Sequence, residues 1–354
     1  MPVFGIPEDA YAYAGVDAGR LSAEGARSSS APRLALPGRE RPIDTVFVLA
    51  GGGTRGALQV GMLRALCEGG IKPDLVVGTS IGAVNAVAFA GAANIEGVYL
   101  AADVWRRIAT SDVFPRTRFH GTWRFFERRE AVYPSEGLRR IVSGFLRFDR
   151  LEDAPIPVVV VATRLEDATE EWISDGSAVD AVMASAALPG LYPAVERHGF
   201  HYIDGGVLDN VPISAALAAR PRRVYVLLCA GLDRVVPQID RPYEALLAAF
   251  SINLHGRLRR DLAAVPHDVD VIVFDEPDLP HVDIEDLSHT TELIERGYLS
   301  ARQTLDDYQA LAVRRAEAAN RLRRAVGAQS ERFERGIEEL LSRRPKGRGT
   351  PPDR

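Results

Sequence analysis

The sequence has 354 residues, 46% of them hydrophobic and 26% charged, and its 43 Lys and Arg against 48 Asp and Glu give a net charge of −5. A chain of this kind can bury a large core without disulfides, and two cysteines make neither a disulfide framework nor a metal site. No run reaches the ~18 apolar residues of a membrane span, and residues 1–9 lack the basic and apolar regions of a signal peptide. We therefore predict a soluble, cytoplasmic protein.

Residues 1–42 are predicted to form a disordered arm before the folded part. Gly, Ala, Ser and Pro are abundant there, most clearly in Ser28-Ser-Ser-Ala-Pro32 and Pro37-Gly-Arg-Glu40. Segments poor in large apolar residues bury too little surface to offset the entropy lost when the backbone is ordered. We expect one folded domain over residues 43–308.

The first predicted strand covers residues 43–50, a continuous apolar run typical of a buried strand. The glycine-rich turn Gly51-Gly-Gly-Thr-Arg-Gly56 and an amphipathic helix follow it. Two chemistries use such a turn. One is dinucleotide binding, because the turn fits G-x-G-x-x-G, but that site also needs an acidic residue at the end of the second strand. The other is an oxyanion hole, in which backbone N–H groups stabilise a negative oxygen.

The second strand begins after Asp74 and ends in Gly78-Thr79-Ser80-Ile81-Gly82, before a helix-like segment over residues 83–90. The acidic residue that ribose binding requires is therefore missing from the end of this strand. Strand, G-x-S-x-G turn and helix are instead the layout of a nucleophile elbow, whose glycines permit a cramped turn that exposes the serine. We predict Ser80 as a nucleophile; the alternative is an ordinary loop in which Ser80 caps the helix.

The segment Trp105–Arg129 combines aromatic and basic residues. It holds seven Arg, only two acids and six aromatics, which are Trp105, Phe114, Phe119, Trp123, Phe125 and Phe126. Rings and guanidinium groups together suit an anionic lipid surface, although the same mixture could stack on single-stranded nucleic acid. A mobile cover with its aromatics packed inward is the alternative. We predict a lid or a peripheral membrane contact here.

The second half of the chain alternates strand and helix patterns, which favours a mostly parallel sheet covered by helices. The strands are expected at 157–162, 223–230 and 269–274, and the intervening helices at 212–219 and 243–265. Two late helices are expected at 290–308 and 309–342. The tail over residues 314–354 holds twelve Arg or Lys and six Asp or Glu, a local net charge of +6.

A serine nucleophile needs a base. None of the seven histidines lies in a loop with the glycine-rich pattern of a catalytic turn. His198 and His201 flank a predicted hairpin and are expected at the surface. The pattern Tyr202-Ile-Asp204-Gly205-Gly206 places an acid before two glycines. An acid at such a turn is more often a cap or turn former, but it can also serve as the base.

Taken together, these motifs resemble a known family. Gly51-Gly-Gly-Thr-Arg-Gly56, Gly78-Thr-Ser80-Ile-Gly82 and Asp204-Gly-Gly206 occur in the order of the three blocks of the patatin-like phospholipases, and residues 184–193 are similar to a helix-to-proline block that precedes the last of them. The resemblance runs from about residue 43 to residue 212. It implies a three-layer α/β/α fold related to the α/β-hydrolases, with a mostly parallel central sheet, and metal-independent hydrolysis of lipid acyl esters with no cofactor.

The resemblance also implies roles for individual residues. Ser80 would be the nucleophile and Asp204 the general base, forming a Ser-Asp dyad, and the N–H groups of Gly52 and Gly53 would form the oxyanion hole. The supporting residues of the motifs would be Gly51, Thr54, Arg55, Gly56, Gly78, Gly82, Gly205 and Gly206. Thr54 is a small departure, because the family more often has a smaller residue there.

The prediction is therefore a serine hydrolase that cleaves acyl esters of (phospho)lipids, of phospholipase A or lysophospholipase type. An acyltransferase or thioesterase using the same dyad, or a catalytically idle relative that binds lipids or a protein, remains the alternative. Nucleic acid is not expected as a partner, and residues 309–354 are expected to form an Arg-rich helical extension that matches no block of the family.

Overall fold

The computed structural model describes residues 34, 36, 42–114, 133–229, 256–276, 286–311 and 313–314. Its centre is an eight-stranded sheet. The strands are β1 (Thr45–Leu49), β2 (Leu75–Thr79), β3 (Val158–Arg164), β4 (Thr169–Ile173), β5 (Val195–Arg197), β6 (Phe200–Asp204), β7 (Arg223–Leu227) and β8 (Asp270–Phe274).

Five strands of the sheet are parallel to one another, in the order β3-β2-β1-β7-β8. The other three, β4, β5 and β6, are antiparallel to their neighbours at the β3 end. The mostly parallel sheet is thus confirmed. The antiparallel strand β4 was not predicted, because its segment TEEWI is largely polar and lacks the apolar run of the buried strands.

Short helices connect the strands. They are α2 (Ala57–Glu68), α3 (Ile81–Ala90), α4 (Ile95–Arg107), α5 (Thr110–Val113), α6 (Glu136–Phe145), α7 (Ala178–Ser185) and α8 (Ile213–Ala218), with the 3-10 turns η2 (Gly53–Gly56), η4 (Leu151–Asp153) and η5 (Gly205–Val207). Residues 256–263 and 290–311 are also helical. Of the helix predicted at 243–265, the part before residue 256 lies outside the described residues.

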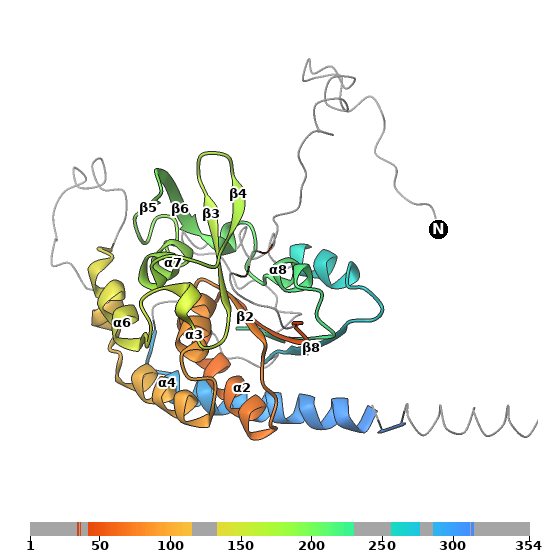
Figure 1. Ribbon diagram of the computed structural model, residues 1–354. Helices are drawn as coiled ribbons and strands as arrows, with labels where there is room; N and C mark the ends of the chain where they lie inside the picture. Colours follow the sequence, from red (N-terminus) through yellow and green to blue (C-terminus); the bar gives the residue numbers. More distant parts are fainter. Residues whose placement is uncertain are drawn as a thin grey trace, which may run out of the picture.

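The helices cover both faces of the sheet, which confirms the three-layer architecture (Figure 1). Alternate residues of each strand point to opposite faces. Phe47 and Leu49 pack on the side of α2, α3 and α7, whereas Val46 and Val48 pack on the side of α8 and of Leu258. Burying each such side chain contributes about 1.5–3 kcal/mol.

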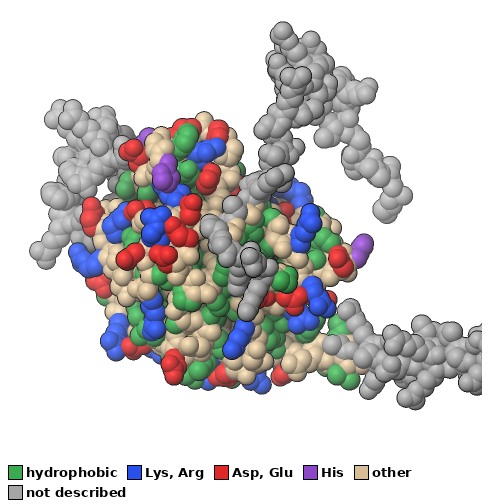
Figure 2. Space-filling view, viewed as in Figure 1, with side chains coloured by type: hydrophobic (Ala, Val, Ile, Leu, Met, Phe, Trp, Pro, Cys, Tyr) green, Lys and Arg blue, Asp and Glu red, His purple; other side chains and the backbone are tan. Residues whose placement is uncertain are grey.

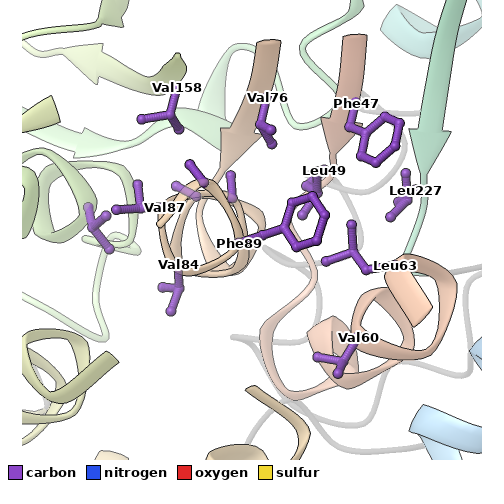
Figure 3. Close-up of a cluster of buried hydrophobic side chains, with 14 of the residues drawn as sticks. Phe47, Leu49, Val60, Leu63, Val76, Val84, Val87, Phe89, Val158 and Leu227 are labelled. Carbon is purple, nitrogen blue, oxygen red and sulfur yellow. The ribbon is translucent and has the colours of Figure 1, made fainter. Parts of the chain in front are cut away.

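The larger core cluster lies between the sheet and the helices α2 and α3. Phe47 of β1 stacks on Phe89 of α3 with ring centroids 6.1 Å apart, and Leu63 of α2 lies beside them (Figure 3). Because α2 and α3 follow β1 and β2 directly, this packing fixes the direction in which the chain leaves each strand. It therefore also fixes the two turns that carry the candidate site.

The helix over residues 290–311 packs closely against α2 and is the blue helix that passes behind it in Figure 1. A methyl group on Gly297 would lie 2.1 Å from the carbonyl oxygen of Leu58, and one on Gly61 would lie 1.9 Å from that of Ile294. The predicted break between helices at residues 308 and 309 is wrong, because one helix continues through this point. Residues 298–326 contain neither Gly nor Pro, so no stop signal stands there.

We expect Gly297→Ala to lower the free energy of unfolding by about 1–3 kcal/mol, because the new methyl group would force the two backbones apart. Gly144→Ala is the matched control, since nothing lies within 4 Å of its added methyl group in α6 and Ala is the better helix former. Urea unfolding of both variants checks the prediction. A Gly297→Ala protein as stable as Gly144→Ala would contradict the close packing of the two helices.

Two leucines of the predicted arm lie against the folded part of the chain. Leu34 and Leu36, which fall within the predicted arm, pack against the core cluster on the α8 side of the sheet.

In the part of the chain that the structure describes, every helix is too short or too polar to cross a membrane. On the face seen in Figure 2, acidic and basic side chains are interspersed. The predicted tail beyond residue 314 lies outside the described residues.

Candidate active site

The pairing of β3 brings two distant parts of the chain to one place. β4 lies along one edge of β3, and β2 and β6 share the other edge, because Val161 pairs with both Trp172 of β4 and Thr79 of β2. The next residue of β3, Ala162, pairs with Asp204 at the end of β6. The ends of β2 and β6 therefore meet on this edge, and the residue after Thr79 lies next to Asp204.

Ser80 occupies the turn between β2 and α3 in a backbone conformation that residues with a side chain rarely adopt. Its φ is 56° and its ψ is −125°, which costs of the order of 1–3 kcal/mol for a residue with a side chain. The turn is tight: a methyl group on Gly78 would lie 2.4 Å from the carbonyl oxygen of Gly82, and one on Gly82 would lie 2.2 Å from that of Leu49. Both glycines are thus required by close backbone contact.

The hydroxyl of Ser80 donates a hydrogen bond to the carboxylate of Asp204, with 2.6 Å between Ser80 Oγ and Asp204 Oδ2. The other carboxylate oxygen accepts a hydrogen bond from the N–H of Gly206 at 2.7 Å. Asp204 is 2% exposed. Burial raises the pKa of Asp204 to about 6, against the opposing effect of these two hydrogen bonds.

Ser185 supports the strained turn from the end of α7. Its hydroxyl accepts a hydrogen bond from the N–H of Ser80 at 2.8 Å and donates one to the carbonyl of Val161. The side chain is fully buried. The sequence analysis gave Ser185 no role, although it lies in the block over residues 184–193; a small polar residue in an otherwise apolar helix end was the only available signal.

The glycine-rich turn lies directly against Ser80. A methyl group on Gly51 would lie 3.2 Å from Ser80 Cβ. Gly51 and Asn210 bind each other reciprocally, because the Gly51 N–H donates to the Asn210 carbonyl at 3.0 Å and the Asn210 amide donates to the Gly51 carbonyl at 3.2 Å. Asn210 was missed from the sequence, where only the turn-like run Asp209-Asn210-Val211-Pro212 pointed to it.

Gly52 and Gly53 stand at the start of η2, where the first N–H groups of a helical turn have no partner within the turn. Gly53 needs to be glycine because its φ is 59°. A methyl group on Gly52 would lie 2.2 Å from Cys229 Cβ, so the buried Cys229 backs this turn. Burial raises the pKa of the Cys229 thiol to about 12, which keeps it neutral. Thr54 and Gly56 are buried within η2, and Arg55 is partly exposed there.

A chain of buried amide groups ties the glycine-rich turn to three helices. Gln59 of α2 donates to the carbonyls of Ala50 and Leu227 and accepts a hydrogen bond from Asn85 of α3 at 2.8 Å. Asn85 in turn accepts a hydrogen bond from the indole of Trp105 at 3.0 Å. Because these groups satisfy one another, the network holds the turn in a single position.

This network corrects the prediction for the start of the aromatic and basic segment. Trp105 and Phe114 are buried in the core and do not face a membrane. Phe114 packs against Tyr133 and Tyr192, with ring centroids 5.4 Å and 6.5 Å away. The other four aromatics of the segment lie outside the described residues.

The histidines of the described residues lie elsewhere. His198 occupies the turn between β5 and β6, His201 pairs with Glu166 on the surface, His289 faces Asp286 and Glu292, and His267 is exposed. No group of three or more His, Cys, Asp or Glu that could hold a metal occurs in the part that the structure describes. The arrangement at Ser80 thus combines a strained serine, a buried carboxylate that accepts its hydrogen bond and nearby backbone amides, which are the groups that nucleophilic attack on an ester carbonyl requires.

Residues 47–217 match the family model described as "Patatin-like phospholipase". "Patatin-like phospholipase domain-containing protein 7" of Rattus norvegicus is 32% identical over 172 residues, which cover 48% of this chain and 12% of that protein. "Lysophospholipase NTE1" of Mycosarcoma maydis is 30% identical over 224 residues, or 62% of this chain and 11% of that protein. The chain thus spans a small part of either relative. The crystal structure of VipD from Legionella pneumophila aligns with a TM-score of 0.41 and 14% identity, over 75% of this chain and 67% of that one.

Proposed function

We propose that the protein, whose residues 47–217 match the family model of the patatin-like phospholipases, is a serine hydrolase that cleaves acyl esters of lipids. The observation that carries the proposal is the hydrogen bond of 2.6 Å between Asp204 and Ser80, a partly buried serine in a strained turn. The names of the two relatives, a patatin-like phospholipase and a lysophospholipase, support a lipid as the substrate.

In the proposed mechanism Ser80 Oγ attacks the acyl carbonyl while Asp204 accepts the hydroxyl proton. The carbonyl oxygen becomes negative and is stabilised by the N–H groups of Gly52 and Gly53. Collapse of this intermediate breaks the ester bond, and the leaving alcohol takes the proton from Asp204. Water then attacks the acyl-serine with Asp204 again as the base, which releases the fatty acid and restores Ser80.

A carboxylate is a weak base in water, but burial makes this one stronger. Its pKa of about 6 places Asp204 in the ionised form at neutral pH while keeping it a better proton acceptor than an exposed Asp. The Gly206 N–H holds the second oxygen, so that Oδ2 faces Ser80. The dyad therefore needs no histidine as an intermediary.

The pH dependence of hydrolysis tests the role of Asp204. Since only the ionised carboxylate accepts a proton, kcat/KM should rise tenfold per pH unit below about 6 and be constant above it. Initial rates between pH 4.5 and 8.5 measure this. A rate that is independent of pH across this range would contradict Asp204 as the base.

The raised pKa of Asp204 also makes the stability of the folded protein depend on pH. Stability should fall over the pH range in which activity rises, which gives an independent control. A carboxyl whose pKa is raised on folding stabilises the protein below its unfolded pKa of 3.8, and this contribution is lost as the pH rises through about 6. Asp204→Asn has no carboxyl at this position, so this pH-dependent contribution is absent. Relative to wild type, it should therefore gain stability between pH 4 and pH 8, as measured by urea unfolding at both values.

The proposed function is tested by incubating the full chain with lysophosphatidylcholine, a diacyl phosphatidylcholine and an acyl-CoA thioester, and measuring fatty acid release by mass spectrometry. We expect release from the lysophospholipid in wild type and in the presence of EDTA, and none from Ser80→Ala. Release from acyl-CoA alone, or acyl transfer to an added alcohol without hydrolysis, would favour the thioesterase or acyltransferase alternative. No turnover of any ester would favour the idle, lipid-binding relative.

A further inference from the structure

A partly buried ionic cluster lies on the α8 side of the sheet, beside the loop that follows Asp204. Its centre is Arg257, in the helix over residues 256–263. The guanidinium contacts Asp209 at 2.9 Å, Glu170 of β4 at 2.8 Å and Asp261 at 3.3 Å. It also donates to the main-chain carbonyl of Leu208 at 3.1 Å. One cation therefore joins β4, the loop and the helix.

Arg257 is the positively charged partner of the buried Asp209 side chain. Its side chain is 1% exposed, and its Oδ1 atom has no hydrogen-bond partner among the described residues. Its Oδ2 atom accepts hydrogen bonds from Arg257 and from Ser214 of α8. Burial, and then the charge of Glu170, raise the pKa of Asp209 to about 7, while Arg257 acts in the opposite direction. Removing one partner of a buried ion pair leaves an uncompensated charge.

The main chain of Asp209 connects the two segments that carry the reacting groups. Its N–H donates to the carbonyl of Gly205 at 2.8 Å, one residue after Asp204. Its carbonyl accepts a hydrogen bond from the hydroxyl of Thr79 at 2.9 Å, one residue before Ser80. Asp209 thus links the main chain after Asp204 to the residue before Ser80.

We propose that Arg257 is a positioning residue for the reaction: by holding Leu208 and Asp209, it fixes the separation of Ser80 and Asp204. The inference rests on the proposed function. Arg257 lies outside residues 47–217, so the segment that matches the family receives this support from the later part of the chain. The side chain does not contact the reacting atoms and acts through the loop alone.

The first test compares Arg257→Ala with wild type in the hydrolysis of the best lysophospholipid substrate. A reacting group displaced by about 1 Å loses roughly 100-fold in rate, so we expect kcat to fall by about 10- to 100-fold while KM stays within a factor of about three. Arg257→Lys, which keeps the charge but not the forked donor, should recover part of kcat. Arg260→Ala, an exposed residue of the same helix, is the matched control and should leave kcat unchanged.

A second variant separates positioning from stability, because Arg257→Ala leaves Asp209 buried without a counter-charge. In the double variant Arg257→Ala/Asp209→Asn neither charge remains. We expect its midpoint of urea unfolding to return toward that of wild type while kcat stays low, since the contact with Leu208 is still missing.

The outcomes are distinct. A low kcat in a double variant of restored stability supports the proposal. An unchanged kcat in Arg257→Ala, or a kcat that recovers together with stability in the double variant, overturns it while the proposed function stands. If wild type hydrolyses no ester at all, the proposed function itself fails, and the positioning role fails with it.

Discussion

Ser80→Ala is expected to lower kcat for ester hydrolysis by about 10⁴-fold or more, because it removes the oxygen atom that is proposed to form the acyl-enzyme. The substitution removes the oxygen that lies 2.6 Å from Asp204 and leaves the strained turn in place. Fatty acid release from a lysophospholipid, measured over hours with concentrated protein, can detect a rate that is lower than that of wild type by this factor.

Two controls belong with this variant. Ser143→Ala removes an exposed hydroxyl of α6 that donates to the carbonyl of Arg139, and it should be as active as wild type. Circular dichroism should show the same folded content in both variants. Substantial hydrolysis by a well-folded Ser80→Ala protein would mean that the nucleophile lies elsewhere.

Asp204→Asn should lower kcat by about 10²- to 10⁴-fold, the range that general-base catalysis supplies. The amide has the size of the carboxylate but cannot accept the serine proton. It can still accept the N–H of Gly206, so the loop should keep its shape. The residual rate should also lose the rise with pH below about 6 that is expected of wild type.

The matched control is Asp306→Asn, an exposed residue of the helix over residues 290–311. It makes the same chemical change on the exposed face of this helix and should have no effect on kcat. Loss of activity in His201→Ala with full activity in Asp204→Asn would point to a histidine-based triad and would remove the dyad.

The two glycine-rich turns could be predicted because their signals are local. An apolar run, a G-x-S-x-G turn and a helical segment lie within a few residues of one another around Ser80, and the structure has β2, the turn and α3 at these places. The same holds for β1, η2 and α2 around Gly51–Gly56. Each strand leads into its helix without an intervening long loop, so the sequence pattern determined the local structure.

Asp204 could not be assigned from its own surroundings, where an acid before two glycines is an ordinary turn former. Its position depends on β6 pairing antiparallel with β3 next to the end of β2, and no local pattern predicts such a register. The role of Asp204 was therefore predicted from the resemblance to the patatin-like phospholipases.

The supporting residues were missed for a related reason. Ser185 and Asn210 bond to main-chain atoms far away in the sequence. Main-chain partners leave no complementary side chain for a sequence pattern to detect. Similarly, Trp105 looked like part of a basic, membrane-facing segment, because the sequence does not show that Asn85 of α3 accepts its indole N–H inside the core.

The most direct measurement is covalent labelling with a fluorophosphonate, followed by peptide mapping, because only an activated serine reacts with it. Wild-type protein should be modified at Ser80 alone, and Asp204→Asn should be modified at least about 100-fold more slowly. Labelling of another serine, or labelling of Ser80 at the same rate with and without the Asp204 carboxylate, would contradict the account.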